Sequence, residues 1–327
     1  MNLAHNMHYF VFGKGNSYLF TDKRFKSKLK GNGLIQTRNP LLCKLIICRN
    51  IEIAKIASLL FPFKKIIVHQ TELFVDTTRT KRVHIYKFKT VAVINGFNKG
   101  VFFNNYHFLS SYIYDDEIDL GLKKSQLIST SDILSETEFK SAKPVIFIGQ
   151  KRRVDEINKN NSFNCIDLNV KRQEIAQCAF DKGVGDVIGR GWNEISGIKN
   201  SGFDSGFENW WDLKLEIIKG YRFNIAFENT LWKYYVTEKI WHSIKAGSLP
   251  IYWGKGSSIY ESFPQDSFID ASDFKNSSDL IDYITNLTYD LWYLRMEKCI
   301  KVYNDSIKKM NYCKLDEAIN KIIERIY

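Results

Sequence analysis

The chain has 327 residues, enough for two domains of ordinary size, and its 44% hydrophobic and 14% aromatic content excludes a disordered protein. Its formal net charge of +11 requires either an anionic partner or a generally basic surface, because the lysines are spread along the chain without a dense run. No apolar run is long enough to span a membrane, and the first residues do not have the pattern of a signal peptide.

The six cysteines include no CxxC pair and no zinc-ligand spacing. Most of them stand among apolar residues, which is typical of free buried thiols and favours a reducing compartment. We therefore expect a cytoplasmic protein. Peripheral contact with the inner membrane surface is an alternative location that the basic charge leaves open.

The N-terminal half predicts an α/β domain. Apolar runs at 7–12, 41–48, 65–69 and 90–94 predict strands, and residues 51–61 have apolar side chains at helical spacing. The strand-helix-strand order favours a parallel sheet. Glu72 follows the third of these strands, where a carboxylate can face a ligand. The alternative is that Glu72 is an ordinary surface glutamate. If this edge of the sheet holds a catalytic base, His69 is the other candidate.

The acidic residues 115–119 (DDEID) resemble a metal-binding motif but are more typical of a solvated turn, so we predict no metal site. Residues 120–142 are polar and predict a linker with one helix. We therefore predict two domains, 1–142 and 143–327.

The second half repeats the α/β pattern. Residues 144–148 and 185–189 predict strands, residues 170–180 predict a helix, and 278–327 predicts three amphipathic helical pieces. Between them, 190–214 is rich in glycine, asparagine and aromatic residues, and predicts a flap or a packed loop.

Residues 221–273 have the clearest secondary-structure pattern in the chain. The apolar run 223–227 predicts a buried strand, Thr237 a helix N-cap, Gly247 the helix end, and 249–253 the next strand. This strand-helix-strand unit predicts a parallel pair.

A ligand site is expected at the junction of this strand and helix. In open α/β sheets, ligands bind at the carboxyl ends of the strands, and helix N-termini attract phosphate. Lys239 in the first helical turn adds a charge that can contact the same anion. A capped, solvated helix start is the alternative interpretation.

Four segments of this region, FNIAFEN, YVTEKIW, LPIYWG and FPQDSFIDASDF, resemble the signature of the α1,3/α1,4-fucosyltransferases, glycosyltransferase family 10. The resemblance covers roughly the C-terminal 150 residues. It implies a GT-B fold with two Rossmann-like domains, a cleft between them and C-terminal helices. It also implies GDP-fucose as donor, inversion at the anomeric carbon and, because no anchor is evident, a bacterial type of enzyme.

The resemblance also implies site residues. The donor-binding set is Arg172, Glu228, Asn229, Tyr235, Thr237, Glu238 and Lys239. Glu72 matches the general base of the family, although Leu73 stands where a proline is often found nearby. No cofactor is required by this resemblance, and a divalent metal is at most stimulatory. Segment 190–214 is longer than the family pattern.

The predicted function is transfer of L-fucose from GDP-fucose to a hydroxyl of a GlcNAc- or glucose-type sugar in a bacterial surface glycan, with α1,3 or α1,4 linkage. The acceptor is an oligosaccharide or a lipid-linked glycan. Three alternatives remain: a transferase using a different nucleotide sugar, a module that has lost its base, and a basic, aromatic-rich protein that binds single-stranded nucleic acid. No nucleic-acid-binding motif occurs, so nucleic acid is not a predicted partner.

Overall fold

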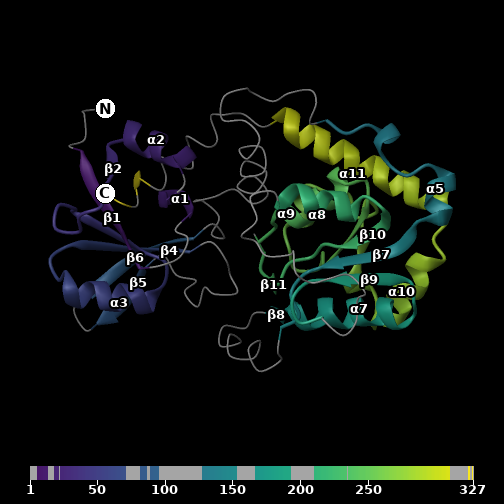
Figure 1. Cartoon of the computed structure of the whole chain (residues 1–327), viewed down its shortest axis with the longest axis horizontal. Helices are drawn as coiled ribbons and strands as arrows, with labels where there is room; N and C mark the ends of the chain where they lie inside the picture. The colour runs from purple at the N-terminus through teal and green to yellow at the C-terminus, as the bar shows by residue number, and fades with distance from the viewer. Residues whose placement is uncertain are drawn as a thin grey trace. The chain divides into compact units, whose positions relative to one another are not determined.

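A computed structural model describes residues 6–13, 18–21, 23–70, 82–86, 89–95, 127–152, 166–192, 210–233, 235–309, 323–324 and 326. Contacts between residues divide the chain into two compact units, Met1–Ser110 with Asn311–Tyr327 and Ser111–Met310. The chain therefore begins and ends in the same unit (Figure 1). Each unit is an α/β structure built on a mainly parallel sheet, as the GT-B prediction requires.

The first unit contains a six-stranded sheet in the order β2-β1-β3-β4-β6-β5. Neighbouring strands are parallel except β5 and β6, which are antiparallel. Its elements are β1 (Met7–Phe12), α1 (Tyr18–Thr21), α2 (Lys23–Gly31), β2 (Leu34–Gln36), β3 (Leu45–Cys48), α3 (Ile51–Leu60), β4 (Lys65–Gln70), β5 (Arg82–Tyr86) and β6 (Lys89–Asn95). The predicted strand 41–48 thus begins only at Leu45, and sequence analysis missed β2 and β5.

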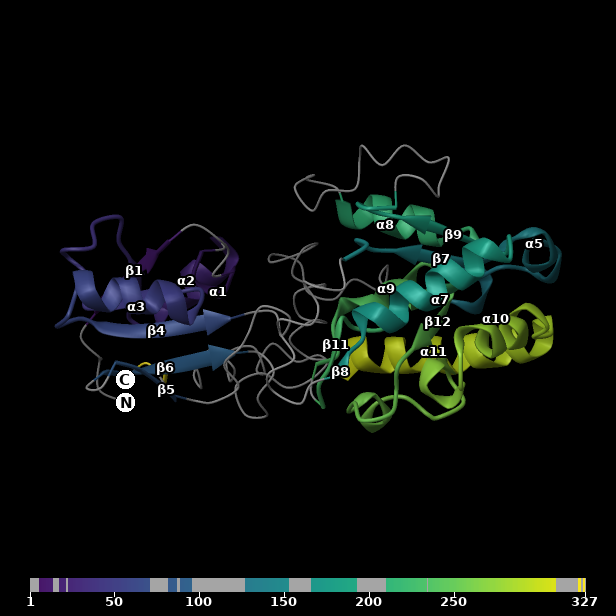
Figure 2. The same ribbon diagram turned by 90° about the horizontal axis from the view of Figure 1, so that it is seen from below.

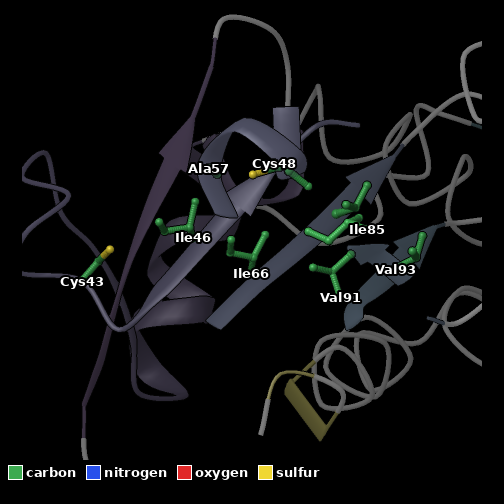
Figure 3. Close-up of a cluster of buried hydrophobic side chains, with 10 residues drawn as sticks. Cys43, Ile46, Cys48, Ala57, Ile66, Ile85, Val91 and Val93 are labelled. Atoms are coloured by element: carbon green, nitrogen blue, oxygen red, sulfur yellow. The ribbon is translucent and has the colours of Figure 1, made fainter. Parts of the chain in front are cut away.

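Helix α3 illustrates how the sequence builds this unit. The side chain of Asn50 accepts a hydrogen bond from the Ile53 backbone N–H at 2.9 Å, which caps the helix start. Ala54 and Ala57 on its buried face pack in a cluster with Ile46, Ile66 and other apolar side chains of the sheet (Figure 3). The helix predicted at 51–61 is therefore confirmed, and it covers one face of the sheet.

The second unit contains a five-stranded, fully parallel sheet in the order β13-β12-β10-β7-β9. Helices α7 and α10 lie on one face of it and α8, α9 and α11 on the other (Figures 1 and 2). Its elements are η2 (Thr130–Asp132), α5 (Glu136–Ser141), β7 (Lys143–Ile148), β8 (Ile166–Asp167), α7 (Asn169–Asp181), β9 (Gly185–Ile188), α8 (Trp210–Ile218), β10 (Tyr221–Ile225), β11 (Thr230–Leu231), α9 (Glu238–Lys245), β12 (Leu249–Tyr252), η5 (Ile259–Glu261), β13 (Ile269–Asp270), η6 (Ala271–Asp273), α10 (Ser277–Thr285) and α11 (Tyr289–Lys309).

The strand order of the second unit marks a binding position. Strands β7 and β10 are neighbours, while the chain leaves β7 toward β9 and leaves β10 toward β12. Successive connections therefore diverge on the two sides of this strand pair, which is the topological switch point where open α/β sheets bind ligands. The residues that follow β10, beginning with Ala226, lie at this point.

The segment predicted as a linker packs on the second unit from Ile128 onward. The Ile128 N–H donates to Asn304 on α11 at 3.0 Å, and a capping box at Ser135 starts α5. Phe139 then packs against Tyr289 and Trp292. Trp292 is fully buried and donates to the Arg222 carbonyl at 2.9 Å, so this side chain belongs to the core.

Within the described residues, the helices include none with the length and apolar character that crossing a bilayer requires.

Candidate active site

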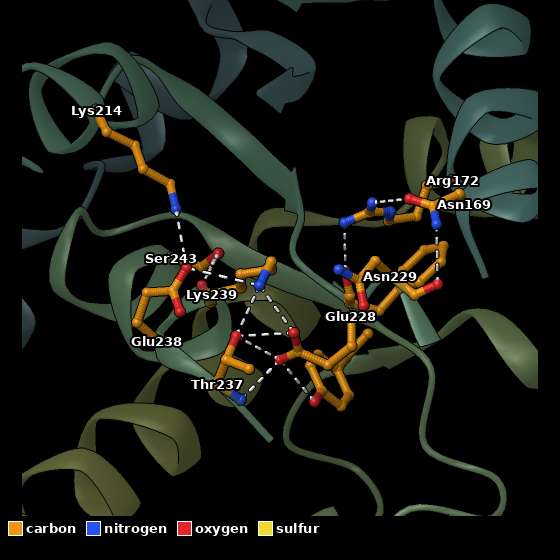
Figure 4. Close-up of polar contacts among 11 residues, drawn as sticks. Asn169, Arg172, Lys214, Glu228, Asn229, Thr237, Glu238, Lys239 and Ser243 are labelled. Atoms are coloured by element: carbon orange, nitrogen blue, oxygen red, sulfur yellow. Dashed lines mark hydrogen bonds and ion pairs between the residues drawn. The ribbon is translucent and has the colours of Figure 1, made fainter. Parts of the chain in front are cut away.

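The carboxylate of Glu228, just beyond β10, is the centre of the site. Its side chain is only 3% exposed, and Oε1 accepts the Thr237 backbone N–H at 2.7 Å. The Thr237 hydroxyl lies 2.8 and 2.7 Å from the two carboxylate oxygens, and the Tyr252 hydroxyl donates to Oε1 at 3.3 Å. A buried carboxylate is stable only with such partners. Glu228 therefore fixes the start of α9 against β12 (Figure 4).

Lys239 is the member of this group that reaches the surface. Its Nζ lies 2.8 Å from Glu228 Oε2, 2.7 Å from Thr237 Oγ1 and 3.6 Å from Glu238 Oε1. Its side chain is 24% exposed, against 3% for Glu228. Burial disfavours the charged ammonium, but the carboxylates of Glu228 and Glu238 outweigh this effect and raise the pKa of Lys239 above its ordinary value. Lys239 is therefore a permanent cation held at a fixed position.

The start of α9 differs in one respect from the prediction. Thr237 is the N-cap residue, as predicted, but its side chain makes no capping hydrogen bond to the helix. Its hydroxyl and its N–H are both directed to Glu228 instead. The N–H at the start of α9, which was predicted to bind a phosphate, is thus bonded to the Glu228 carboxylate. Contacts to a ligand anion must come mainly from side chains around it.

A second lysine, which is buried, completes the group. Lys214 on α8 has a side chain that is 7% exposed, and its Nζ lies 3.9 Å from Glu238 Oε1. Burial lowers the pKa of Lys214 to about 8, although Glu238 favours its charged form. Burial raises the pKa of Glu238, but Lys239 and Lys214 outweigh it and hold that carboxyl ionised. We call Lys214, Glu228, Thr237, Glu238 and Lys239 the Glu228 cluster.

Arg172 approaches the same position from α7. The two-stranded pair β8–β11 and the Leu168 N–H, which donates to the Asn229 carbonyl at 2.9 Å, join the start of α7 to the loop after β10. The Arg172 guanidinium donates to the Phe227 carbonyl at 3.3 Å and to Asn169 Oδ1. Burial lowers the pKa of Arg172 to about 10, with Glu228 acting in the opposite direction.

Two buried polar atoms at this position have no hydrogen-bond partner among the described residues. They are Nε of Arg172 and Oδ1 of Asn229. Buried polar atoms are nearly always satisfied in folded proteins, so these two atoms are available to a ligand.

The charges favour an anionic ligand. Arg172, Lys214 and Lys239 carry three positive charges against two negative charges on Glu228 and Glu238. Burial, together with the nearby lysines, lowers the pKa of His242 far below its usual value, so this histidine is neutral and adds no charge. The site therefore has an excess positive charge at the carboxyl end of β10, where it suits a phosphate or diphosphate group.

The comparison with known families agrees with this chemistry. Residues 198–325 match the model of the glycosyltransferase family 10 (fucosyltransferase) C-terminal region. Over these residues the chain is similar to glycosyltransferase family 10. The matched region contains β10, α9 and the whole Glu228 cluster, whereas Arg172 lies before it in the sequence.

Two relatives and one solved structure show the extent of the similarity. The chain is 44% identical over 84 residues to an alpha-(1,3)-fucosyltransferase of Helicobacter pylori, which is 25% of this chain and 17% of that protein. It is 35% identical over 106 residues to a human 3-galactosyl-N-acetylglucosaminide 4-alpha-L-fucosyltransferase, 31% of this chain and 29% of that protein. The aligned stretches thus span less than a third of either relative. A crystal structure of an alpha1,3-fucosyltransferase superposes with a TM-score of 0.49 at 18% identity, covering 94% of this chain and 82% of that one.

The structure brings most of the predicted donor-binding residues together. Glu228, Thr237, Glu238 and Lys239 form one hydrogen-bonded and ion-paired group, and Arg172 lies beside them. The buried side chains of Asn229 and Tyr235 belong to the same loop. The roles of these residues toward a nucleotide sugar stay predictions. The predicted base, Glu72, and the acidic segment 115–119 lie outside the described residues.

Sequence analysis missed Lys214. It was counted only as the end of the segment 190–214, which was predicted to be a flap or loop. The structure places it on α8, between Leu213 and Leu215. A lysine that interrupts an apolar helical segment is a weak signal, because only tertiary packing determines whether its amine is buried.

Glu228→Gln tests how the cluster holds Lys239. The amide keeps the shape of the side chain but removes the charge that balances the ammonium. We expect the second unit to lose about 3 kcal/mol of unfolding free energy, the low end of the range for breaking a buried ion pair, since Lys239 is partly exposed. Urea unfolding measures this loss. Glu297→Gln, on the exposed side of α11, is the control and should leave stability unchanged; equal loss in both variants would contradict the role of Glu228.

Lys214 gives the site a pH dependence. Above its pKa of about 8 the ammonium becomes neutral, while Lys239 remains charged. We expect GDP to bind about tenfold more weakly at pH ~9 than at pH ~7, a loss of about 1.4 kcal/mol measured by calorimetry. An unfolded lysine keeps its proton up to pH ~10.4. This group therefore makes unfolding less favourable as the pH rises above 8, so the weaker binding does not reflect unfolding.

Two variants separate Lys214 from other groups that titrate in this range. Lys214→Met should bind GDP weakly at both pH values, and any remaining change with pH then belongs to the nucleotide or to another side chain. Lys214→Arg should retain tight binding at the higher pH. An identical pH step in wild type and Lys214→Met would show that Lys214 has no part in it.

Proposed function

We propose that this chain transfers L-fucose from GDP-fucose to a hydroxyl group of an acceptor sugar. The observation that carries the proposal is the excess positive charge at the carboxyl end of β10. Lys214 and Lys239 lie in the region that matches the family 10 model, and Arg172, which supplies the excess, lies before it in the sequence. Fucose is proposed as the transferred sugar because the family description and the names of both relatives specify fucosyltransferases. The donor nucleotide is the one implied by the resemblance of the FEN and YVTEK segments.

In the proposed complex, the diphosphate of the donor lies between Arg172 and Lys239. A guanidinium binds phosphate oxygens in pairs, and the ammonium provides a point charge. Glu228 and Thr237 act by positioning Lys239, to which they are hydrogen bonded. The unsatisfied atoms of Arg172 and Asn229 become satisfied by the donor, and Tyr235 lies in the same loop.

The proposed reaction inverts the anomeric carbon. Glu72 takes the proton of the acceptor hydroxyl, whose oxygen attacks the anomeric carbon from the face opposite the diphosphate. The new C–O bond forms as the bond to the β-phosphate oxygen breaks, and GDP leaves with the electron pair. Negative charge therefore grows on the β-phosphate, where Arg172 and Lys239 stabilise it. These cations supply the counter-charge, so we propose that no cofactor is required and that a divalent metal is at most stimulatory.

The acceptor side of the proposal depends on the N-terminal part of the chain. We propose that residues 1–142 bind a GlcNAc- or glucose-type sugar of a bacterial surface glycan, either as an oligosaccharide or linked to a lipid. Residues 143–327 bind the donor, and the linkage is α1,3 or α1,4. The described cysteines Cys43, Cys48, Cys178 and Cys299 are free thiols, which supports a cytoplasmic location.

A transfer assay with the purified chain tests this function. GDP-fucose is compared with GDP-mannose and UDP-glucose, each against GlcNAc-, glucose- and galactose-terminated acceptors. We expect product only with GDP-fucose, and donor hydrolysis with GDP-fucose when no acceptor is present. Turnover of another nucleotide sugar in preference to GDP-fucose would favour the alternative donor, and binding of GDP without any turnover would favour a module that has lost its base.

A further inference from the structure

One edge of the first unit carries several exposed apolar side chains. At the amino ends of β3 and β4, five large apolar side chains are more than half exposed: Leu41 75%, Leu42 68%, Leu59 69%, Leu60 60% and Phe63 100%. We call these five residues the amino-end patch. Single exposed apolar residues are ordinary, but a group of this size on one edge marks an interaction site.

The loops that carry the amino-end patch are tied together. Lys64 Nζ donates to the carbonyls of Pro40, Leu41 and Cys43 at 2.7, 2.9 and 2.7 Å, so all three of its N–H groups are used. Lys89 Nζ donates to the Pro62 carbonyl at 2.6 Å on the other side. The loop before β3 and the loop before β4 are thereby fixed side by side. The exposure of Leu41, Leu42 and Phe63 is thus built into the fold.

The surroundings of the amino-end patch are positively charged. Lys44 directly precedes β3, and Lys65 is the first residue of β4. Glu52, the one acidic side chain of residues 37–69, lies in the first turn of α3 and pairs with Lys55 at 2.9 Å. Arg38, Lys44 and Lys65 are exposed beside the patch. Exposed apolar side chains next to exposed cations are the combination that anionic membrane surfaces bind.

We propose that the amino-end patch docks the first unit on an anionic lipid bilayer, with Leu41, Leu42 and Phe63 in the headgroup region and the cations on lipid phosphates. A second copy of the chain fits less well, because five side chains are far fewer than the roughly 20–30 residues a side of a stable interface. The carboxyl ends of parallel strands, where ligands bind, are at the opposite edge of the sheet. Docking at the amino ends therefore leaves that edge open.

Vesicle co-sedimentation tests this proposal, and it does not depend on transferase activity. Wild-type chain should bind vesicles of equal parts phosphatidylglycerol and phosphatidylcholine, and bind phosphatidylcholine alone much less. Leu41→Ser/Leu42→Ser/Phe63→Ser should weaken binding to the mixed vesicles at least about tenfold, since the variant has lost the apolar groups that insert. The control, Leu291→Ser/Leu294→Ser, removes two side chains of 51% and 48% exposure from α11 and should bind like wild type.

A charge variant tests the second part of the proposal. Arg38→Glu/Lys44→Glu should lose the preference for phosphatidylglycerol, and wild-type binding should weaken as salt is raised. Absence of vesicle binding by wild type, or equal binding by the triple-serine variant, would overturn the proposal. Light scattering that shows a dimer in wild type and a monomer in the triple-serine variant would also overturn it, because the patch would then bind a second copy of the chain.

Discussion

Replacing Lys239 with methionine is expected to lower kcat with GDP-fucose about 100- to 1,000-fold, the usual effect of removing one preorganised donor from a developing charge. Methionine keeps most of the apolar stem and removes only the ammonium. Because the negative charge on the β-phosphate grows in the transition state, we expect a larger effect on kcat than on KM. Steady-state kinetics with a saturating acceptor measure both constants.

The control for this variant is Lys219→Met, which removes an exposed lysine just after α8 and should have normal kinetics. Lys239→Met also leaves Glu228 without its cation and is expected to be less stable. The double variant Lys239→Met/Glu228→Gln removes both charges of the pair and should regain stability. If it also regains turnover, the ammonium has only a structural function and the proposed role of Lys239 is wrong.

Glu72→Gln is expected to reduce kcat about 100- to 10,000-fold while GDP binds as in wild type. The amide cannot accept the proton of the acceptor hydroxyl, and general base catalysis typically contributes a factor of this size. The acid limb of the pH–rate profile, which reports ionisation of the base, should disappear in the residual activity. Rapid-quench kinetics and calorimetry with GDP measure the two properties separately.

Glu52→Gln on α3 is the matched control, since this glutamate is 75% exposed and belongs to the same unit. It should leave turnover unchanged. Near-normal turnover in Glu72→Gln would move the base to another residue, of which His69 is the first to test by substitution. Loss of GDP binding in Glu72→Gln would instead indicate that the substitution disturbs the fold or the donor site.

The regular elements near the site could be predicted because their signals are local. The apolar run before Glu228 predicted β10, and Thr237 with Gly247 predicted both ends of α9. Gly247 has a φ of 73°, a conformation that glycine adopts without strain, so this residue specifies the helix end almost by itself. Local backbone preference was sufficient for these elements.

Short strands and strands at a sheet edge could not be predicted in this way. β2 has three residues and β5 pairs antiparallel at the sheet edge, so neither has an apolar pattern long enough to recognise. The predicted strand 41–48 was too long at its start. Leu41 and Leu42 are apolar but exposed, and an apolar residue signals burial only when its neighbours in space cover it.

The sequence by itself determined the class of each unit, the strand and helix around Glu228, and the similarity of the C-terminal region to glycosyltransferase family 10, because periodicity, capping residues and ordered motifs are properties of neighbouring positions. The tertiary structure alone decided which charges meet. Arg172, Lys214 and Lys239 come from three different helices, and Glu228 is the internal partner of Lys239. Burial and ion pairing depend on distances between segments far apart in the chain, and no local pattern contains those distances.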